Sequence, residues 1–234
     1  MPLRRWLESA NNAIEGILGA AKSQRHLRYH LYAAAFVLLF CYVLGITKIE
    51  FLIIAVTIML VIALELINTS IETTVNLLSP EINELARVAK DVAAGAVLTI
   101  AVGAAVIGYI ILFPYLVTFF NNGLTVATHG GNDIAVLALL IVIILVVIIK
   151  ALTKSGHPLR GGMTSGHAAV AFSIWVSITL ITKNLLASVF ALFAALMIAQ
   201  SRVATRVHTK WEVFIGATIG SLITYVLFRL FSHV

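Results

Sequence analysis

Seven apolar runs follow one another along the chain, separated by polar segments. They span Leu31–Ile46, Phe51–Ile67, Val92–Phe113, Ile134–Ile149, Ala168–Thr182, Leu185–Ala199 and Val213–Phe228. A helix needs roughly 20 residues to cross the hydrocarbon core of a bilayer, so the shorter runs must extend into their polar flanks. The pattern predicts an all-α integral membrane protein with about seven transmembrane helices.

One long connection interrupts this series, from Pro114 to Asp133. It contains a proline and the sequences Asn-Asn-Gly and Gly-Gly, which favour loops over helices. We therefore expect two membrane domains, residues 1–113 with three transmembrane helices and residues 134–234 with four. Residues 114–133 would form an extracytoplasmic linker between them.

The composition excludes a soluble protein, since 61% of the residues are hydrophobic, 11% are charged and the mean hydropathy is +1.04. Residues 1–30 are instead polar and basic, with apolar residues at helical spacing. This segment predicts an amphipathic helix on the membrane surface, not a cleaved signal. The net charge of +6 fits anionic lipid headgroups better than nucleic acid. The single cysteine, Cys41, excludes an internal disulfide.

The basic residues predict the orientation of the chain. With the N-terminus in the cytoplasm, every Lys and Arg except Lys48, Lys183 and Arg229 falls on the cytoplasmic side. This asymmetry follows the positive-inside rule. We expect a multi-pass protein of a bacterial-type plasma membrane, with its C-terminus outside and both candidate sites described below on the cytoplasmic side.

A polar stripe begins inside the second apolar run. Glu65, Asn68, Glu72 and Asn76 share one helical face at about 100° per residue. Acids within a membrane are rare and mark functional sites, although a helix exit that caps the bundle is the plainer alternative. One carboxylate can accept the proton of a lipid hydroxyl, and the other can hold a divalent cation against nucleotide phosphates.

Residues from roughly Ala10 to Leu112 resemble the small prokaryotic diacylglycerol kinase and undecaprenol kinase family. The matching segments are ELINTSIE at 65–72, SPE at 79–81 and AKDVAAGAVL at 89–98. The resemblance implies ATP and Mg²⁺ as cofactors, and a homotrimer whose sites lie between protomers beneath the surface helix. It assigns the base to Glu65, site organisation to Asn68, a metal ligand to Glu72, and nucleotide contacts to Lys90 and Asp91.

Two positions depart from that family. Gln24 stands where the family has a second metal-binding glutamate, four residues before Arg28, and Asn76 replaces the aspartate that closes the stripe. An amide oxygen coordinates Mg²⁺ without adding charge, so the affinity for the ion should fall. The site is therefore a retuned or a disabled kinase. We expect activity to be retained, because the base and one metal ligand are present.

Two later segments, KSGHPLRGGMTSGHAAVAF and QSRVATRVHTKWEV, hold a second group of candidates. They supply guanidinium groups, backbone amides at a helix start and imidazoles, which together can bind and transfer a phosphoryl group. The candidates are Lys154, Arg160, Ser165, Gly166, His167, Arg202, His208 and Glu212. Glu212 follows His208 by one helical turn and can orient its ring.

Thr164-Ser165-Gly166-His167 and Ser201-Arg202, followed by His208, resemble the second and third motifs of the type 2 phosphatidic acid phosphatase family, over about Asn132 to Phe231. The resemblance implies that His208 forms a phosphohistidine and His167 is the general acid, without a cofactor. It assigns phosphate binding to Arg160, Ser165, Gly166 and Arg202, and to Lys154 from the first motif.

This half also departs from its family. Glu212 replaces the usual aspartate, Thr164 replaces a proline, and Lys154 and Arg160 enclose five residues instead of six. The shortened first motif weakens the case for Lys154. His157 is either a substitute donor or a loop residue, and we interpret it as the latter.

The two halves together predict an enzyme of membrane lipid phosphate metabolism. A kinase acting on undecaprenol and a phosphatase acting on undecaprenyl diphosphate would both yield undecaprenyl phosphate. The alternatives are a phosphatidate or phosphatidylglycerophosphate phosphatase with an inactive, trimerising kinase half, and a nonenzymatic scaffold or transporter. A transporter should show broken helices near mid-bilayer, whereas these polar clusters lie at the ends of the runs.

Overall fold

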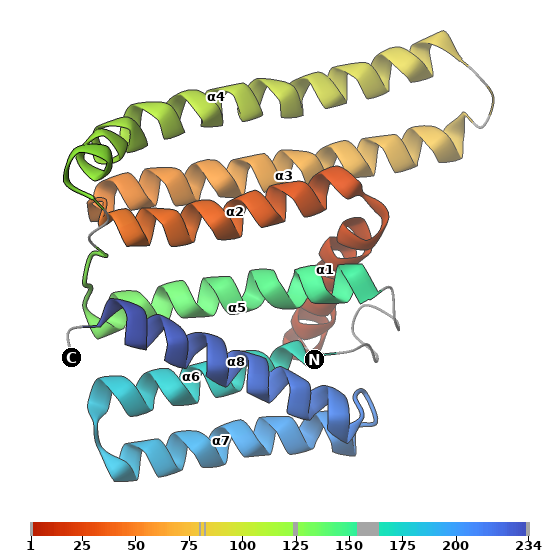
Figure 1. The fold of residues 1–234 in the computed structure, drawn as a ribbon. Helices are drawn as coiled ribbons and strands as arrows, with labels where there is room; N and C mark the ends of the chain where they lie inside the picture. The colour runs from red at the N-terminus through yellow and green to blue at the C-terminus, as the bar shows by residue number, and fades with distance from the viewer. Residues whose placement is uncertain (1, 80, 82, 124–125, 154–163, 233–234) are drawn as a thin grey trace. The chain divides into compact units, whose positions relative to one another are not determined.

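The computed structural model describes residues 2–79, 81, 83–123, 126–153 and 164–232. The regular elements in these ranges are helices: α1 Pro2–Ser23, α2 Arg25–Leu44, α3 Lys48–Leu78, α4 Glu84–Asn122, α5 Gly131–Thr153, α6 Gly166–Thr182, α7 Leu185–Ala204 and α8 Lys210–Phe231. The chain divides into two compact units. One comprises residues 24–125, and the other residues 1–23 and 126–234 (Figure 1).

The helices confirm an all-α integral membrane protein. In the described part of the chain, six of them, α2–α5, α7 and α8, are long and apolar enough to cross a membrane. The remaining apolar helix, α6, has 17 residues. It matches the fifth predicted run and is shorter than the roughly 20 residues that a full crossing requires.

The unit of residues 24–125 is a bundle of α2, α3 and α4. Gly45 adopts a left-handed conformation (φ 67°) that ends α2, and Thr47 and Glu50 form a capping box that starts α3. Cys41 and Ile54 then form an apolar cluster with side chains from the later part of α4. Short loops and buried apolar stripes therefore hold the three helices side by side.

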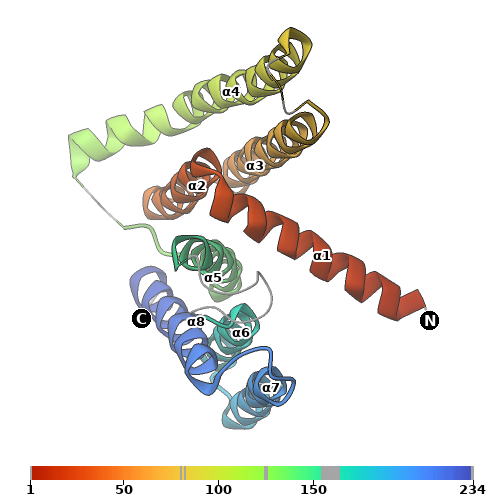
Figure 2. The ribbon, with the colours of Figure 1, turned by 90° about the vertical axis from the view of Figure 1, so that its right-hand side faces the viewer.

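The predicted end of the third apolar helix at Phe113 is wrong, because α4 continues through Pro114 to Asn122. A proline removes one backbone N–H and crowds the preceding turn, which bends a helix without necessarily ending it. Figure 2 shows that α4 changes direction along its length. Thr118 donates a hydrogen bond to the Pro114 carbonyl (3.0 Å), and Tyr115 donates one to the Glu50 carboxylate on α3 (2.7 Å). These bonds hold the segment beyond the proline in helical form.

The first part of the predicted amphipathic segment forms the helix α1, while residues from Arg25 onward belong to α2. Leu18 and Ala21 are buried, and the helix packs on α5. The helix that precedes the kinase-like segment therefore belongs to the same compact unit as residues 126–234.

The unit that contains α5–α8 is organised by the close approach of α6 and α8. A Cβ atom on Gly216 would lie 2.4 Å from a carbonyl oxygen of the facing chain, and one on Gly220 would lie 2.0 Å from another. The facing pairs are Ser165 with Gly216, Ala169 with Gly220, and Ser173 with Thr224. From one facing pair to the next, the residue number rises by four on each of the two helices, so α6 and α8 run parallel. Their N-terminal ends consequently lie at the same end of the unit.

Candidate functional sites at the helix ends

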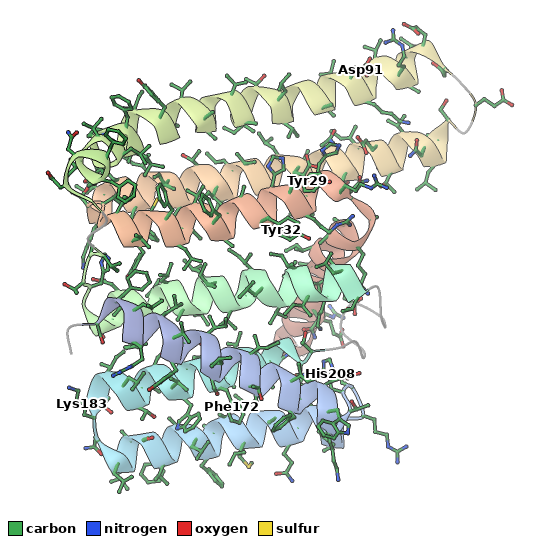
Figure 3. The ribbon with its side chains drawn as sticks, in the orientation of Figure 1. Tyr29, Tyr32, Asp91, Phe172, Lys183 and His208 are labelled. Atoms are coloured by element: carbon green, nitrogen blue, oxygen red, sulfur yellow. The ribbon has the colours of Figure 1, made fainter. Side chains whose placement is uncertain are left out.

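The common end of α6 and α8 gathers the candidates of the second half. The backbone N–H of Ser165 donates to the Glu212 carbonyl (3.0 Å), which ties the residue before α6 to the first turn of α8. The hydroxyl of Ser165 accepts the backbone N–H of Ala168 and caps α6. His167 follows in the first turn and is exposed. Figure 3 shows His208 at this end of the unit and Lys183 at the opposite end.

His208 is held by a carboxylate and by the backbone. Its Nδ1 lies 2.9 Å from Oε2 of Glu212, and the two side chains are 2% and 19% exposed. The same Oε2 accepts the backbone N–H of Thr209 (3.1 Å) as part of the capping box that starts α8. When Nδ1–H donates to the carboxylate, Nε2 carries the lone pair. The geometry therefore orients one nitrogen for nucleophilic attack.

Arg202 reaches this site from the last turn of α7. Its carbonyl accepts the backbone N–H groups of Val207 (3.2 Å) and His208 (3.1 Å), and Arg206 closes the turn at φ 54°. Among the described residues, Nε of Arg202 and the hydroxyl of fully buried Thr164 have no hydrogen-bond partner. Buried donors normally have partners, so the unpartnered Nε of the Arg202 guanidinium is a candidate donor to an anion.

Burial and nearby cations favour the neutral form of His208. Burial lowers the pKa of His208 below its ordinary value, and the positive charges of Lys150 and Arg202 lower it further. The hydrogen bond that the ring makes to the Glu212 carboxylate raises the pKa and opposes this shift. The ring of His167 also lies within electrostatic range of Arg202, Lys150 and His208. The structure thus brings together His167, Arg202, His208 and Glu212, as the sequence predicts. Lys154, His157 and Arg160 lie outside the described residues.

The kinase-like stripe lies on the second half of α3. Glu65 is buried, and the side-chain amide of Asn68 donates to Glu72 (3.3 Å). Oδ1 of Asn68 is buried without a partner among the described residues. Lys90, from the start of α4, donates to the side-chain carbonyl of Asn76 (2.5 Å). The start of α4 is therefore joined to the end of the stripe.

The other two predicted kinase residues have different surroundings. Asp91 is exposed and paired with Arg87 (2.9 Å), which also contacts Glu84 on the same helix. Gln24 is the N-cap residue of α2 and makes no side-chain cap hydrogen bond. A nucleotide contact of Asp91 would therefore have to rearrange its pair with Arg87.

The donor set of the stripe fits a magnesium ion that arrives with a nucleotide. In the described part of the chain, no group of three or more His, Cys, Asp or Glu side chains could hold a metal ion. Mg²⁺ commonly takes one or two protein carboxylates together with substrate phosphates and water. Glu72, with the amide oxygens of Asn68 and Asn76 nearby on α3, matches this smaller requirement.

An apolar pocket of about 300 Å³ lies within the same bundle. Residues of α2, α3 and α4 line it, and they combine alanines, such as Ala34 and Ala101, with larger aliphatic side chains, such as Ile58. Two polar side chains, His30 and Thr57, also face it. Its lining suits a hydrocarbon chain.

Comparisons with known proteins agree with both sets of motifs. The profile of prokaryotic diacylglycerol kinase matches residues 11–112. Undecaprenol kinase of Bacillus subtilis is 40% identical over 114 residues, which cover 49% of this chain and 93% of that relative. The first half of the chain belongs to the prokaryotic diacylglycerol kinase family. A diacylglycerol kinase of Synechocystis is 37% identical over 113 residues, which cover 48% of this chain and 65% of that relative. A diacylglycerol kinase of Haemophilus influenzae is 33% identical over 89 residues, which cover 38% of this chain and 75% of that relative.

The second half matches the PAP2 superfamily over residues 149–233. The chain is therefore a fusion of a member of the diacylglycerol kinase family with a PAP2 domain. These families support lipid kinase and lipid phosphatase activity in general terms. No solved structure matches the chain.

Two features of the PAP2 unit escaped the sequence reasoning. Lys150 is buried at the last turn of α5, where the motif analysis considered only Lys154 and Arg160. The sequence did signal Lys150, because it directly follows an apolar run and charged residues in membrane helices are usually functional. Gly216 and Gly220 form a GxxxG pattern, which marks close helix packing and could have predicted the α6–α8 contact.

Proposed function

We propose that the PAP2 unit hydrolyses a membrane lipid phosphate or diphosphate, with undecaprenyl diphosphate as the preferred substrate. The observation that carries this proposal is the buried His208–Glu212 pair, 2.9 Å apart, at the shared N-terminal end of α6 and α8. The carboxylate favours the tautomer in which Nε2 attacks phosphorus, and His167 in the first turn of α6 donates the proton to the leaving oxygen. Water then releases phosphate from His208.

Binding of the phosphoryl group is assigned to residues around this pair. We assign it to the guanidinium of Arg202, whose Nε is buried, and to the backbone amide of Gly166 at the start of α6, where the helix dipole favours an anion. The backbone N–H of Ser165 already donates to the Glu212 carbonyl, so Ser165 would bind phosphate through its hydroxyl. The unpartnered Nε of Arg202 supports this assignment, because an anion would satisfy it. Lys154 and Arg160 remain phosphate-binding predictions from the first motif.

We further propose that the first half phosphorylates undecaprenol with ATP. Glu65, buried on the stripe, accepts the proton of the lipid hydroxyl, and Lys90 pairs with nucleotide phosphate. Glu72 would hold magnesium, with Gln24 as the weak second ligand, and the bound ion would supply positive charge to the nucleotide phosphates. The similarity to an undecaprenol kinase supports a polyprenol over a diacylglycerol.

Both reactions would supply undecaprenyl phosphate, so they need not oppose each other. Sharing that product requires both sites to face one membrane surface, with a cytoplasmic N-terminus. A homotrimer, as implied by the kinase family, is part of the same proposal.

Two activity assays on the purified full chain test these assignments. One measures phosphate release from undecaprenyl diphosphate and phosphatidate, and the other measures transfer from ATP to undecaprenol and diacylglycerol. We expect His208→Ala to abolish only the first activity and Glu65→Gln only the second. His26→Ala and Glu81→Gln, at exposed positions, are the matched controls. Phosphate release from phosphatidate but not from the polyprenyl diphosphate would reject the preferred substrate, and full activity of His208→Ala would reject the mechanism.

A further inference from the structure

Two threonines are fully buried in the unit that contains α5–α8, and they differ in their hydrogen bonding. Thr164 and Thr224 are both 0% exposed. The hydroxyl of Thr224 on α8 lies 2.7 Å from that of Ser173 on α6, and one of the two donates to the other. The hydroxyl of Thr164 has no hydrogen-bond partner among the described residues. A buried hydroxyl without a partner destabilises the folded state, so its presence at this position needs a reason.

The place of Thr164 in the chain suits an apolar side chain. Ser165 is the N-cap of α6, so Thr164 is the residue just before the cap. An apolar residue at that position often packs against the first turns of the helix. Valine has almost the same shape as threonine and would fill the same space without an unpartnered hydroxyl. Packing alone therefore does not account for the hydroxyl of Thr164.

Backbone hydrogen bonds connect Thr164 to the His208–Glu212 pair. The backbone N–H of Ser165, the next residue, donates to the carbonyl of Glu212 (3.0 Å), whose carboxylate lies 2.9 Å from Nδ1 of His208. On the other side of the pair, the carbonyl of Arg202 accepts the backbone N–H of His208 (3.1 Å). In the described part of this unit, the buried side-chain donors without partners are the hydroxyl of Thr164 and Nε of Arg202. Both of them thus belong to segments that are tied to this pair.

An anion beside the pair would give these donors a partner. The backbone N–H groups of Gly166 and His167 start α6, where a helix leaves its first N–H groups without intrahelical acceptors and carries partial positive charge. We propose that the hydroxyl of Thr164 donates a hydrogen bond to an oxygen of the phosphoryl group that His208 attacks. This inference rests on the proposed phosphatase function and adds one phosphate-binding residue to that site.

The contact explains why a destabilising hydroxyl is kept. The stability that Thr164 removes from the free protein is recovered when the phosphoryl group binds, because the hydroxyl then has an acceptor. The related motif has proline at this position, which carries no side-chain donor, so this contact is particular to the present chain.

The test is Thr164→Val, which removes the hydroxyl and keeps the shape of the side chain. Phosphate release from undecaprenyl diphosphate and from phosphatidate is measured on the purified full chain, with inorganic phosphate as the inhibitor. We expect the inhibition constant of inorganic phosphate to rise about tenfold, the effect of losing one hydrogen bond to a charged group. The midpoint of thermal inactivation without phosphate should rise by roughly 2–8 °C, because the unpartnered hydroxyl is gone. A threonine with only a structural role would not combine weaker phosphate binding with higher stability.

The matched control is Thr224→Val, which changes the other fully buried threonine. It breaks the bond with Ser173, so the thermal midpoint should fall, while the inhibition constant should stay within about threefold of the wild-type value. Thr164→Ser keeps the hydroxyl and should also stay within about threefold.

An inhibition constant of Thr164→Val within about threefold of the wild-type value would overturn the phosphate contact. Weaker inhibition together with a lower thermal midpoint would overturn it too, since damage to the fold accounts for both. If Thr164→Val does not fold, the comparison of Thr164→Ala with Thr164→Ser decides by the same inhibition constant. Absence of phosphate release by the wild type from both lipids would instead reject the phosphatase function itself.

Discussion

The parallel packing of α6 and α8 predicts a large effect of Gly220→Ala. The added Cβ would lie 2.0 Å from the carbonyl oxygen of Ala169, whereas ordinary contact begins near 3.4 Å, so the helices must separate by about 1.4 Å. Backbone atoms cannot rotate away, so overpacking should cost roughly 1–3 kcal/mol. Separation would also weaken the buried Ser173–Thr224 hydrogen bond (2.7 Å), worth about 1 kcal/mol.

The same displacement should disturb the candidate site, because Ser165 and Glu212 are joined across these two helices. A misplacement of about 1 Å can lower a catalytic rate about 100-fold. We therefore expect kcat/KM for phosphate release to fall about 100-fold. A total destabilisation of about 2–4 kcal/mol should lower the midpoint of thermal inactivation by roughly 4–16 °C.

The assay is phosphate release after heating in detergent, with Gly103→Ala as the matched control. A Cβ on Gly103 meets nothing within 4 Å, so this change on α4 should be neutral or slightly stabilising. Wild-type kinetics and thermal midpoint for Gly220→Ala would refute the close parallel approach of α6 and α8.

Three further predictions concern the candidate sites. Glu212→Gln should lower kcat of the phosphatase about a thousandfold or more, because the amide no longer fixes the His208 tautomer, and Glu212→Asp should recover part of it. The lowered pKa of His208 keeps its ring neutral to lower pH, so kcat/KM should decline only below about pH 6.5, and a decline that begins well above pH 6.5 would contradict the assignment. Because the folded state holds the ring neutral, the folded state should also lose stability as the pH falls through the lowered pKa of His208. Asn76→Asp should lower the Mg²⁺ concentration that half-saturates lipid kinase activity, since it adds a carboxylate beside Lys90, and an unchanged Mg²⁺ titration would argue against a role of Asn76 at the metal.

The sequence alone determined the fold class and the spacing of the candidate residues along each helix. Hydropathy is a local property of the chain, so the apolar runs located α2–α8. The runs did not give the helix bounds, since α3 continues to Leu78 and α4 spans Glu84–Asn122. The spacing of Glu65, Asn68 and Glu72 and the four-residue step from His208 to Glu212 are helix-period signals, which is why they predicted shared faces correctly.

Only the tertiary structure decided which separate helices meet. Gly216 and Gly220 allow α6 and α8 to run in close parallel contact, and this contact sets Ser165 beside Glu212. The docking of α1 on α5 has no counterpart in local spacing. Such contacts depend on backbone approach and burial between segments far apart in the chain, whereas hydrophobic periodicity reports only which face of each helix avoids water.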